Sequence, residues 1–269
     1  MTDTVRTLVE NSGLPPGEAR LLIAHALGVD RAWLVAHADD GIVLPRQAMA
    51  RSLLQRRGDG EPIAYILGRR EFHGLDLAVT PDVLIPRPET ELLVDLALDR
   101  MGDSACRVLD LGTGSGAIAI ALARAAPGAE VWAADCSPAA LDVARANAER
   151  HAVGVHFVAS DWFAGLPGAR FDLVISNPPY VAADDPHLCE GDVRFEPRAA
   201  LVGGADGLDC IRRVVREARA HLRAPGWLLF EHGYDQGSAS RALLKEAGYA
   251  QIESWPDLAN IPRVSGGRR

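Results

Sequence analysis

The sequence has few cysteines, almost no lysine and no long apolar run. Its 269 residues include four cysteines, none in a Cys-x-x-Cys pair, so we expect no metal site. No stretch approaches the roughly 20 apolar residues that a membrane helix needs, and the first residues lack the basic flank and apolar block of a signal peptide. The sequence therefore predicts a cytoplasmic protein with reduced thiols and no membrane contact.

The charged residues argue against a polyphosphate partner. The net charge is −8, and residues 1–74 contribute nothing to it because they hold nine basic and nine acidic side chains. The remaining residues hold 19 basic and 27 acidic side chains, which is unfavourable for binding nucleic acid. Lys245 stands alone against 27 arginines, which we interpret as compositional bias. We expect no direct binding to nucleic acid.

The hydrophobic pattern divides the chain into a helical part and an α/β part. Residues 1–70 show helical spacing, with prolines opening the helices and Gly28 ending one of them, which predicts a bundle of four or five short helices. Residues 71–86 alternate apolar and polar side chains around turn signals at His73-Gly74 and Pro81-Asp82. This alternation predicts a β-hairpin linker.

Residues 87–269 read as a single α/β domain. Strands are expected at 107–112, 130–135, 155–160, 171–176, 227–233 and 249–255, with helices between most of them. The alternation predicts a doubly wound, mostly parallel sheet with helices on both faces. Ligands should bind at the carboxyl ends of its strands. The final stretch, 257–269, gives little information.

A glycine-rich turn follows the first strand of this domain. Its sequence is Gly112-Thr113-Gly114-Ser115-Gly116, and glycines allow the main chain to approach a ligand closely. The spacing lacks the later glycine of the dinucleotide fingerprint, and the turn offers no lysine to a phosphate. Asp110, expected beneath the amino-acid end of the cofactor, would repel phosphate and attract an ammonium group. These features favour S-adenosylmethionine (SAM) over NAD.

Acidic and aromatic residues follow the next two strands. Asp135 lies 23 residues after Gly112, where a carboxylate can accept hydrogen bonds from both ribose hydroxyls. Its alternative role as a helix cap is already filled by Ser137. We interpret Asp161 and Trp162 as flanking an adenine ring, the alternative for Trp162 being packing at the rim. Together these residues predict a nucleoside-binding site.

The sequence Asn177-Pro178-Pro179-Tyr180 follows the fourth strand and should face the same cleft. The prolines stiffen the loop and leave its carbonyl groups as acceptors. The Asn177 side-chain oxygen and the Pro178 carbonyl can accept both hydrogens of one planar –NH₂ group, with Tyr180 against its plane. We interpret the loop as a holder that aims the lone pair of an sp² amino nitrogen at a sulfonium methyl, without a strong general base. A plain surface turn is the alternative.

These motifs carry a resemblance to a known family. The segments DLGTGSG, VWAAD and ISNPPY resemble class I SAM-dependent methyltransferases that act on amino nitrogens. The segments LIPRPETE (84–91), FEPRAAL (195–201) and GGADGLD (203–209), with the helical N-terminal part, resemble the PrmC/HemK family of N5-glutamine methyltransferases. The resemblance covers essentially the whole chain.

The resemblance implies a substrate and roles for the site residues. The substrate is the glutamine of the Gly-Gly-Gln motif in class I peptide chain release factors. Gly112–Gly116, Asp135 and Trp162 would hold SAM, and Asn177 would touch both SAM and the substrate amide. Pro178, Pro179 and Tyr180 would complete the glutamine pocket. The helical domain would grip the release factor, and the enzyme is expected to be a monomer. The residues expected to border the cleft are Arg87, Glu89, Glu196 and Pro197.

Three other functions fit the sequence less well. A nucleic-acid base methyltransferase acting on adenine N6 or guanine N2 would use a similar loop, but the sequence offers no basic domain for it. A module that binds SAM only as a sensor would not need Asn177 aimed at a methyl acceptor. An NAD-dependent oxidoreductase conflicts with the glycine spacing.

Overall fold

The computed structural model describes residues 3–102 and 106–269, and their contacts form two compact units. The first unit runs to Arg69 and also includes Cys189–Phe195, a segment from much later in the chain. The second unit holds Arg70–Leu188 and Glu196–Arg269. The contiguous division made from the sequence placed Cys189–Phe195 with the α/β part, whereas its contacts group it with the helices.

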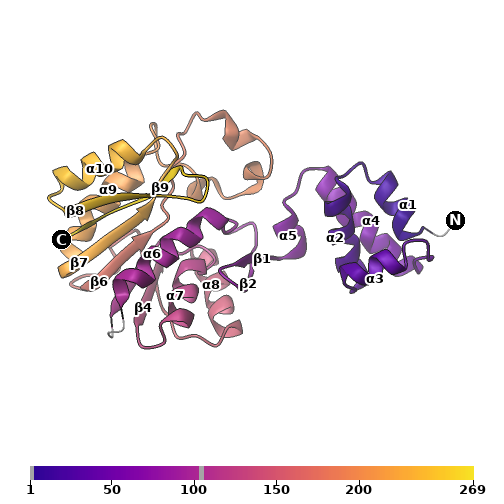
Figure 1. Cartoon of the computed structure of the whole chain (residues 1–269), viewed down its shortest axis with the longest axis horizontal. Coiled ribbons are helices and arrows are strands. Elements are labelled where there is room, and N and C mark those ends of the chain that lie inside the picture. The colour runs from indigo at the N-terminus through magenta and orange to yellow at the C-terminus, as the bar shows by residue number, and fades with distance from the viewer. Residues whose placement is uncertain (1–2, 103–105) are drawn as a thin grey trace. The chain divides into compact units, whose positions relative to one another are not determined.

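The first unit is a helical bundle (Figure 1). Its helices are α1 (Val5–Asn11), α2 (Pro16–Leu27), α3 (Arg31–Ala36), α4 (Leu44–Gly58) and α5 (Ile63–Leu67). Pro16 stands in the first turn of α2, and Gly28 ends it in the left-handed conformation, as the sequence predicted. Arg57 pairs with Glu18 and with Asp192 at 2.7 Å each, so one guanidinium ties α4 to α2 and to the distant segment.

A two-stranded hairpin opens the second unit. It consists of β1 (Arg69–Phe72) and β2 (Leu75–Ala78). His73 and Gly74 have φ of 49° and 73°, the left-handed pair that a tight two-residue hairpin turn requires. The predicted hairpin is thus confirmed, but it spans Arg69–Ala78 rather than residues 71–86. The second turn signal, Pro81-Asp82, precedes no strand, and the chain there runs on as loop toward the 3₁₀ turn Pro88–Thr90.

Within the described residues, seven strands form the main sheet, in the order β5-β4-β3-β6-β7-β9-β8. The strands are β3 (Arg107–Leu111), β4 (Glu130–Asp135), β5 (His156–Ala159), β6 (Phe171–Ser176), β7 (Leu222–Glu231), β8 (Ala250–Pro256) and β9 (Pro262–Arg268). The first five strands of this order, β5, β4, β3, β6 and β7, are parallel to one another. Strand β9 is antiparallel to both β7 and β8. The predicted mostly parallel sheet is confirmed, and its order reverses direction between β3 and β6.

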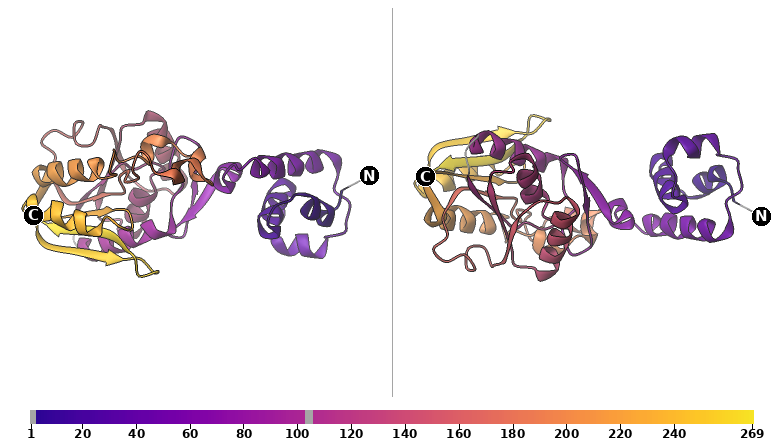
Figure 2. Two further views of the ribbon diagram at one scale, coloured as in Figure 1. Left: turned by 90° about the horizontal axis from the view of Figure 1, so that it is seen from above. Right: turned by 90° about the horizontal axis from the view of Figure 1, so that it is seen from below.

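Helices cover both faces of the sheet (Figures 1 and 2). They are α6 (Glu91–Met101), α7 (Ala117–Ala125), α8 (Pro138–Arg150), α9 (Asp209–His221) and α10 (Gly237–Glu246). Neighbouring residues of β3 point to opposite faces of the sheet, each of which has its own hydrophobic core. Val108 packs with α6 and α7, whereas Leu109 packs with α9. Both faces are therefore buried, which explains the continuous apolar runs of these strands.

The structure corrects one reading of the sequence, because the uninformative stretch 257–269 contains β9. Glycines in a strand interior weaken the sequence signal. Here Gly266 is needed, since a Cβ at that position would lie 2.7 Å from the Leu228 carbonyl oxygen and 2.5 Å from the Leu229 side chain.

In the described part of the chain, no helix is long and apolar enough to cross a membrane.

Candidate active site

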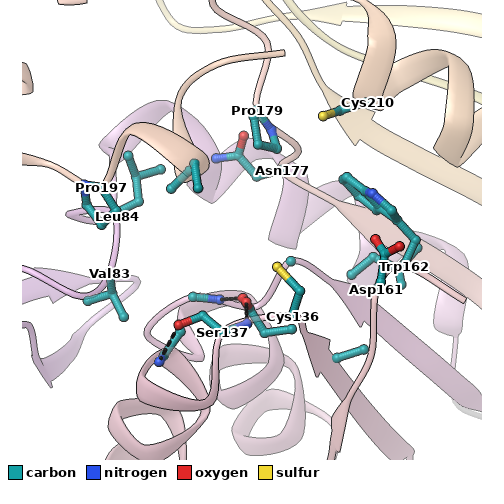
Figure 3. A pocket seen from close by; sticks show the side chains of 18 of the residues that line it. Val83, Leu84, Cys136, Ser137, Asp161, Trp162, Asn177, Pro179, Pro197 and Cys210 are labelled. Atoms are coloured by element: carbon teal, nitrogen blue, oxygen red, sulfur yellow. Dashed lines mark hydrogen bonds between the residues drawn. The ribbon is translucent and has the colours of Figure 1, made fainter. Parts of the chain in front are cut away.

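A cavity of about 320 Å³ opens at the carboxyl ends of β3, β4 and β6. This is where the strand order reverses, the position at which open α/β sheets bind ligands. Figure 3 shows Asn177 and Pro179 facing this space from one side and Asp161 and Trp162 from another. The predicted site residues on its wall are Gly112, Gly114, Asp135, Trp162, Asn177 and Pro179.

The other predicted residues lie behind the cavity wall. Thr113 and Ser115 are buried, and they hold their neighbours: Thr113 donates to Asp110, and the Ser115 carbonyl accepts from Asn147. Gly116 has φ of 84° and begins α7, and a Cβ there would lie 3.1 Å from that of Ala144 in α8. Three of the five residues in the glycine turn therefore shape the turn without facing the cavity.

Asp135 ends β4 and organises the glycine turn. Its carboxylate accepts from the main-chain nitrogens of Gly114 and Ser137, both at 2.9 Å. Ser137 caps α8 by accepting from the nitrogen of Ala140, which confirms that the cap does not need Asp135. Each carboxylate oxygen accepts one of these bonds and can accept a further one, and Asp135 lines the cavity.

Asp110 is a buried carboxyl below the glycine turn. Thr113 donates to it at 2.7 Å, and it forms no ion pair with any residue that the structure describes. Burial raises the pKa of Asp110 to about 7, against the opposing effects of hydrogen bonds from Thr113 and the Ala119 main chain. A group of this kind is half protonated near neutral pH and is sensitive to a nearby cation.

The loop after β5 presents Trp162 in a left-handed conformation, with φ of 53°. The Ser160 hydroxyl holds this loop, because it donates to the Trp162 carbonyl at 2.6 Å and accepts from the Gly165 nitrogen at 2.8 Å. Asp161 forms a two-bond pair with Arg213 of α9, at 2.9 and 3.0 Å. Its carboxylate is thus already engaged, while the Trp162 ring lines the cavity.

The loop after β6 carries Asn177, and the structure fixes how its amide is turned. The Asn177 side-chain nitrogen donates to the Thr90 hydroxyl at 3.1 Å, which leaves the amide oxygen available as an acceptor. Pro178 is buried, and the Tyr180 hydroxyl donates to Glu231 at 2.9 Å. Neither Pro178 nor Tyr180 is among the residues lining the cavity. Thr90 and Glu231 were not singled out from the sequence.

Two segments distant in sequence also contribute to the wall. Asp82, Val83 and Leu84 come from the loop after the hairpin, and Pro197, Ala199 and Ala200 come from the segment after Phe195. The Glu196 side chain is fully buried, pairs with Arg87 and accepts from the Ile85 nitrogen. Of the residues expected to border the cleft, Pro197 lines it, whereas Arg87 and Glu196 join the two segments behind it.

The segment GGADGLD supports the Asn177 loop. The Gly203 nitrogen donates to the Val181 carbonyl, and the Ala183 nitrogen donates to the Gly204 carbonyl, both at 2.9 Å. Gln236 donates to the Tyr180 carbonyl at 3.0 Å. These bonds hold the main chain from Tyr180 to Ala183, so the glycine-rich segment supports the loop from behind without lining the cavity.

The site contains no evident metal centre. In residues 3–102 and 106–269, no group of three or more His, Cys, Asp or Glu side chains is placed to hold a metal ion. Cys136 and Cys210 line the cavity as free thiols.

Comparison with known proteins places the chain in a group of methyltransferases. Residues 2–68 match the model of the PrmC N-terminal domain, and residues 88–189 match the methyltransferase small domain. The chain is 53% identical over 273 residues to the release factor glutamine methyltransferase of Burkholderia pseudomallei (strain K96243), covering 98% of this chain and 96% of that protein. It is 43% identical over 261 residues to the enzyme of the same name from Escherichia coli (strain K12), covering 97% and 94%.

A solved structure supports the fold. The 16S rRNA N2 G1207 methyltransferase of T. thermophilus, in complex with AdoMet and guanosine, aligns with a TM-score of 0.54 and 23% identity. The alignment covers 75% of this chain and 49% of that one. At this level of identity the likeness concerns the fold alone, and it confirms the class I methyltransferase architecture.

Proposed function

This chain belongs to the release factor glutamine methyltransferase family, and on that premise we propose that it methylates the side-chain amide nitrogen (N5) of the Gly-Gly-Gln glutamine in class I peptide chain release factors. The observation that carries the proposal is the orientation of Asn177. Its nitrogen is engaged by Thr90, so its oxygen is presented as an acceptor for an N–H group. A primary amide has the matching donors.

The cavity residues fit SAM as the methyl donor. Asp135 offers two carboxylate oxygens to a ribose, Trp162 offers an aromatic face to a base, and Asp110 lies buried below the glycine turn without a cation. The glycine turn contributes Gly112 and Gly114 to the wall, so that the main chain can approach the ligand. When bound, SAM supplies an electrophilic methyl group on a sulfonium.

The chain's own residues orient the acceptor. An amide nitrogen is a poor nucleophile because its lone pair is delocalised into the carbonyl group. Asn177 Oδ1, on the cavity wall, would hold one of its hydrogens, and the Pro178 carbonyl oxygen, in the next residue of the same loop but not on that wall, is assigned the other; together they would fix the direction of that lone pair. The same acceptors stabilise the positive charge that develops on nitrogen as the N–CH₃ bond forms. The proton becomes acidic only then and is lost to solvent, which explains why no strong base is required.

The helical unit serves recognition of the release factor. A single glutamine side chain offers little to distinguish it from any other, so selectivity needs contacts beyond the acceptor pocket. The match of residues 2–68 to the PrmC N-terminal domain supports this role. A nucleic-acid base substrate is not favoured, because the relatives that match nearly the full chain are named for release factors.

Transfer of labelled methyl from SAM tests the proposed function. The purified protein is offered an unmethylated release factor, the same factor with the glutamine changed to alanine, a short Gly-Gly-Gln peptide, rRNA and DNA. We expect label on the intact factor, much less on the peptide, and none on the alanine variant. Label on rRNA or DNA alone would overturn the proposal, and efficient labelling of the peptide would contradict the role of the helical unit.

Binding of SAM should release protons near pH 7. The pKa of Asp110 is about 7 in the free protein because the carboxyl is buried, and a cationic ligand nearby would lower it. Calorimetry at pH 7 in buffers of different ionisation enthalpy should detect up to about half a proton released. The release should vanish at pH 9, where Asp110 is already ionised, and in Asp110→Asn. Undiminished release by Asp110→Asn would contradict this assignment.

The same group predicts the pH dependence of stability. The folded pKa of Asp110 lies above its usual value of 3.8, so the folded state holds the proton more tightly than the unfolded state. This contribution to stability is fully present below pH 3.8 and is lost as the pH rises through about 7. Melting temperatures of the free protein should therefore decline less between pH 5 and 8 in Asp110→Asn than in the wild type.

A further inference from the structure

Glu231 is a buried carboxyl at the end of β7 that the proposed reaction does not yet use. Its side chain is 1% exposed, and it forms no ion pair with any described residue. Thr90 donates to one of its oxygens at 2.7 Å and Tyr180 donates to the other at 2.9 Å. A buried carboxyl with two side-chain donors has a cost in desolvation that only its partners offset.

The hydrogen bonds around Thr90 have a fixed direction. A threonine hydroxyl has one hydrogen, and in Thr90 this hydrogen is directed to Glu231, which is an acceptor when ionised. The Thr90 oxygen can then only accept from Asn177, so the Asn177 atom that faces it at 3.1 Å must be the –NH₂ group. The carboxylate of Glu231 thus determines, through one hydroxyl, which way the Asn177 amide is turned.

We infer that Thr90 and Glu231 are positioning residues for methyl transfer, which hold the Asn177 oxygen in place for the substrate amide and anchor the loop through the Tyr180 hydroxyl. The inference rests on the proposed function for the identity of that substrate. Thr90 lies in the PRPET segment before α6, Asn177 follows β6, and Glu231 ends β7. The three side chains therefore connect segments that the fold brings together at the carboxyl ends of β6 and β7.

Burial and the neighbouring groups act on the pKa of Glu231 in opposite directions. Burial raises the pKa of Glu231, while the Thr90 and Tyr180 hydroxyls and the charge of Arg263 favour its carboxylate form. Arg263 itself is paired with Asp257 at 3.2 Å. Burial also raises the pKa of Tyr180, so that its hydroxyl keeps the proton it donates to Glu231.

Loss of the network has a specific consequence. An asparagine amide has nearly the same shape after a 180° flip, so without Thr90 the –NH₂ group and the oxygen of Asn177 can exchange places. The flipped form presents donors to the donors of the substrate amide and cannot bind it productively. The fold and the SAM pocket are unaffected by such a flip, so the loss falls on kcat more than on binding.

The test compares Thr90→Val, which keeps the shape and removes the hydroxyl, with Thr90→Ser, which keeps the hydroxyl. We expect Thr90→Val to lower kcat for the release factor by about 10- to 100-fold, with KM and the Kd for SAM changed by only a few-fold. Thr90→Ser should recover most of the activity. Ser265→Ala removes another fully buried hydroxyl from the same sheet, bonded to His232, and should leave kcat near that of the wild type.

A double-mutant comparison separates positioning from a general structural role. If Thr90 acts through Asn177, Thr90→Val should cause little further loss in an Asn177→Ala background. An equal fold-loss in both backgrounds would overturn the inference, as would full activity of Thr90→Val. Glu231→Gln should follow Thr90→Val in its kcat and in the loss of coupling to Asn177.

A readout without substrate distinguishes this inference from the proposed function. In NMR spectra of the free protein with ¹⁵N-labelled asparagine, the Asn177 –NH₂ signal should show slowed hydrogen exchange that is lost in Thr90→Val and kept in Thr90→Ser. Absence of this difference contradicts the positioning role even if the release factor is methylated. If the protection is present but the wild type does not label a release factor, the proposed function fails and the orientation of Asn177 stands.

Discussion

Asn177→Ala is expected to lower kcat for methylation of the release factor by roughly 10²- to 10³-fold. The substitution removes the oxygen that receives one substrate N–H and leaves the Pro178 carbonyl as a single acceptor. With one hydrogen held, the amide can rotate, and its lone pair no longer has a fixed direction. The measurement is single-turnover transfer of labelled methyl under saturating SAM, so that the chemical step is observed.

The fold should tolerate this change. Asn177 is half-buried and its one side-chain bond within the described protein is to Thr90, so circular dichroism and melting temperature should stay close to those of the wild type. The Kd for SAM should rise only modestly, because the remaining cavity wall is intact. Activity within a few-fold of the wild type would show that Asn177 does not hold the substrate amide.

The part of the cavity wall formed by strand ends could be predicted from the sequence because its residues follow strands directly. A residue that directly follows the carboxyl end of a parallel strand lies at the ligand-binding end of the sheet, independently of the conformation of the loops. Asp135 and Asn177 were found in this way. The glycine turn was placed correctly as a unit, but which of its residues face the cavity depends on backbone angles that the sequence does not reveal.

The supporting residues could not be predicted, because their contacts join distant parts of the chain. Thr90 and Glu231 are separated by 141 positions and meet because the tertiary fold brings the turn before α6 to the end of β7. Each has an ordinary local explanation, since Thr90 precedes a helix and Glu231 ends a strand. The assignment of Cys189–Phe195 to the helical unit is similar, because it depends on Arg57 reaching Asp192 across 135 positions.

The second large loss of kcat is expected from a substitution at Gly207, which lies behind the Asn177 loop. Gly207 has φ of 74°, and a Cβ there would lie 2.3 Å from the Tyr180 carbonyl oxygen and 2.8 Å from the Gln236 side-chain nitrogen. We expect Gly207→Ala to push the main chain at Tyr180 outward and break its bond with Gln236. A misplacement of about 1 Å at a reacting group lowers the rate by about 10²-fold, so kcat should fall by about that factor.

Gly168→Ala is the matched control for this substitution. Gly168 has φ of 72°, almost the same backbone conformation, but no atom lies within 4 Å of the Cβ it would gain. Both variants pay the strain of an L-residue in the left-handed region, about 1–2 kcal/mol in the free energy of unfolding, whereas only Gly207→Ala adds the clash. Gly168→Ala should therefore lose stability and keep its kcat.

The comparison isolates geometry from stability, since strain is common to both variants and displacement of the loop is not. The loss of activity in Gly168→Ala measures the effect of lowered stability alone. If Gly207→Ala loses no more activity than that, the segment GGADGLD only stabilises the fold. If its kcat falls further while the Kd for SAM is retained, the position of the Asn177-Pro178-Pro179-Tyr180 loop limits the reaction. The second result is expected, because Tyr180 and Asn177 are joined through Glu231 and Thr90, so a shift at one end of the loop reaches the acceptor at the other.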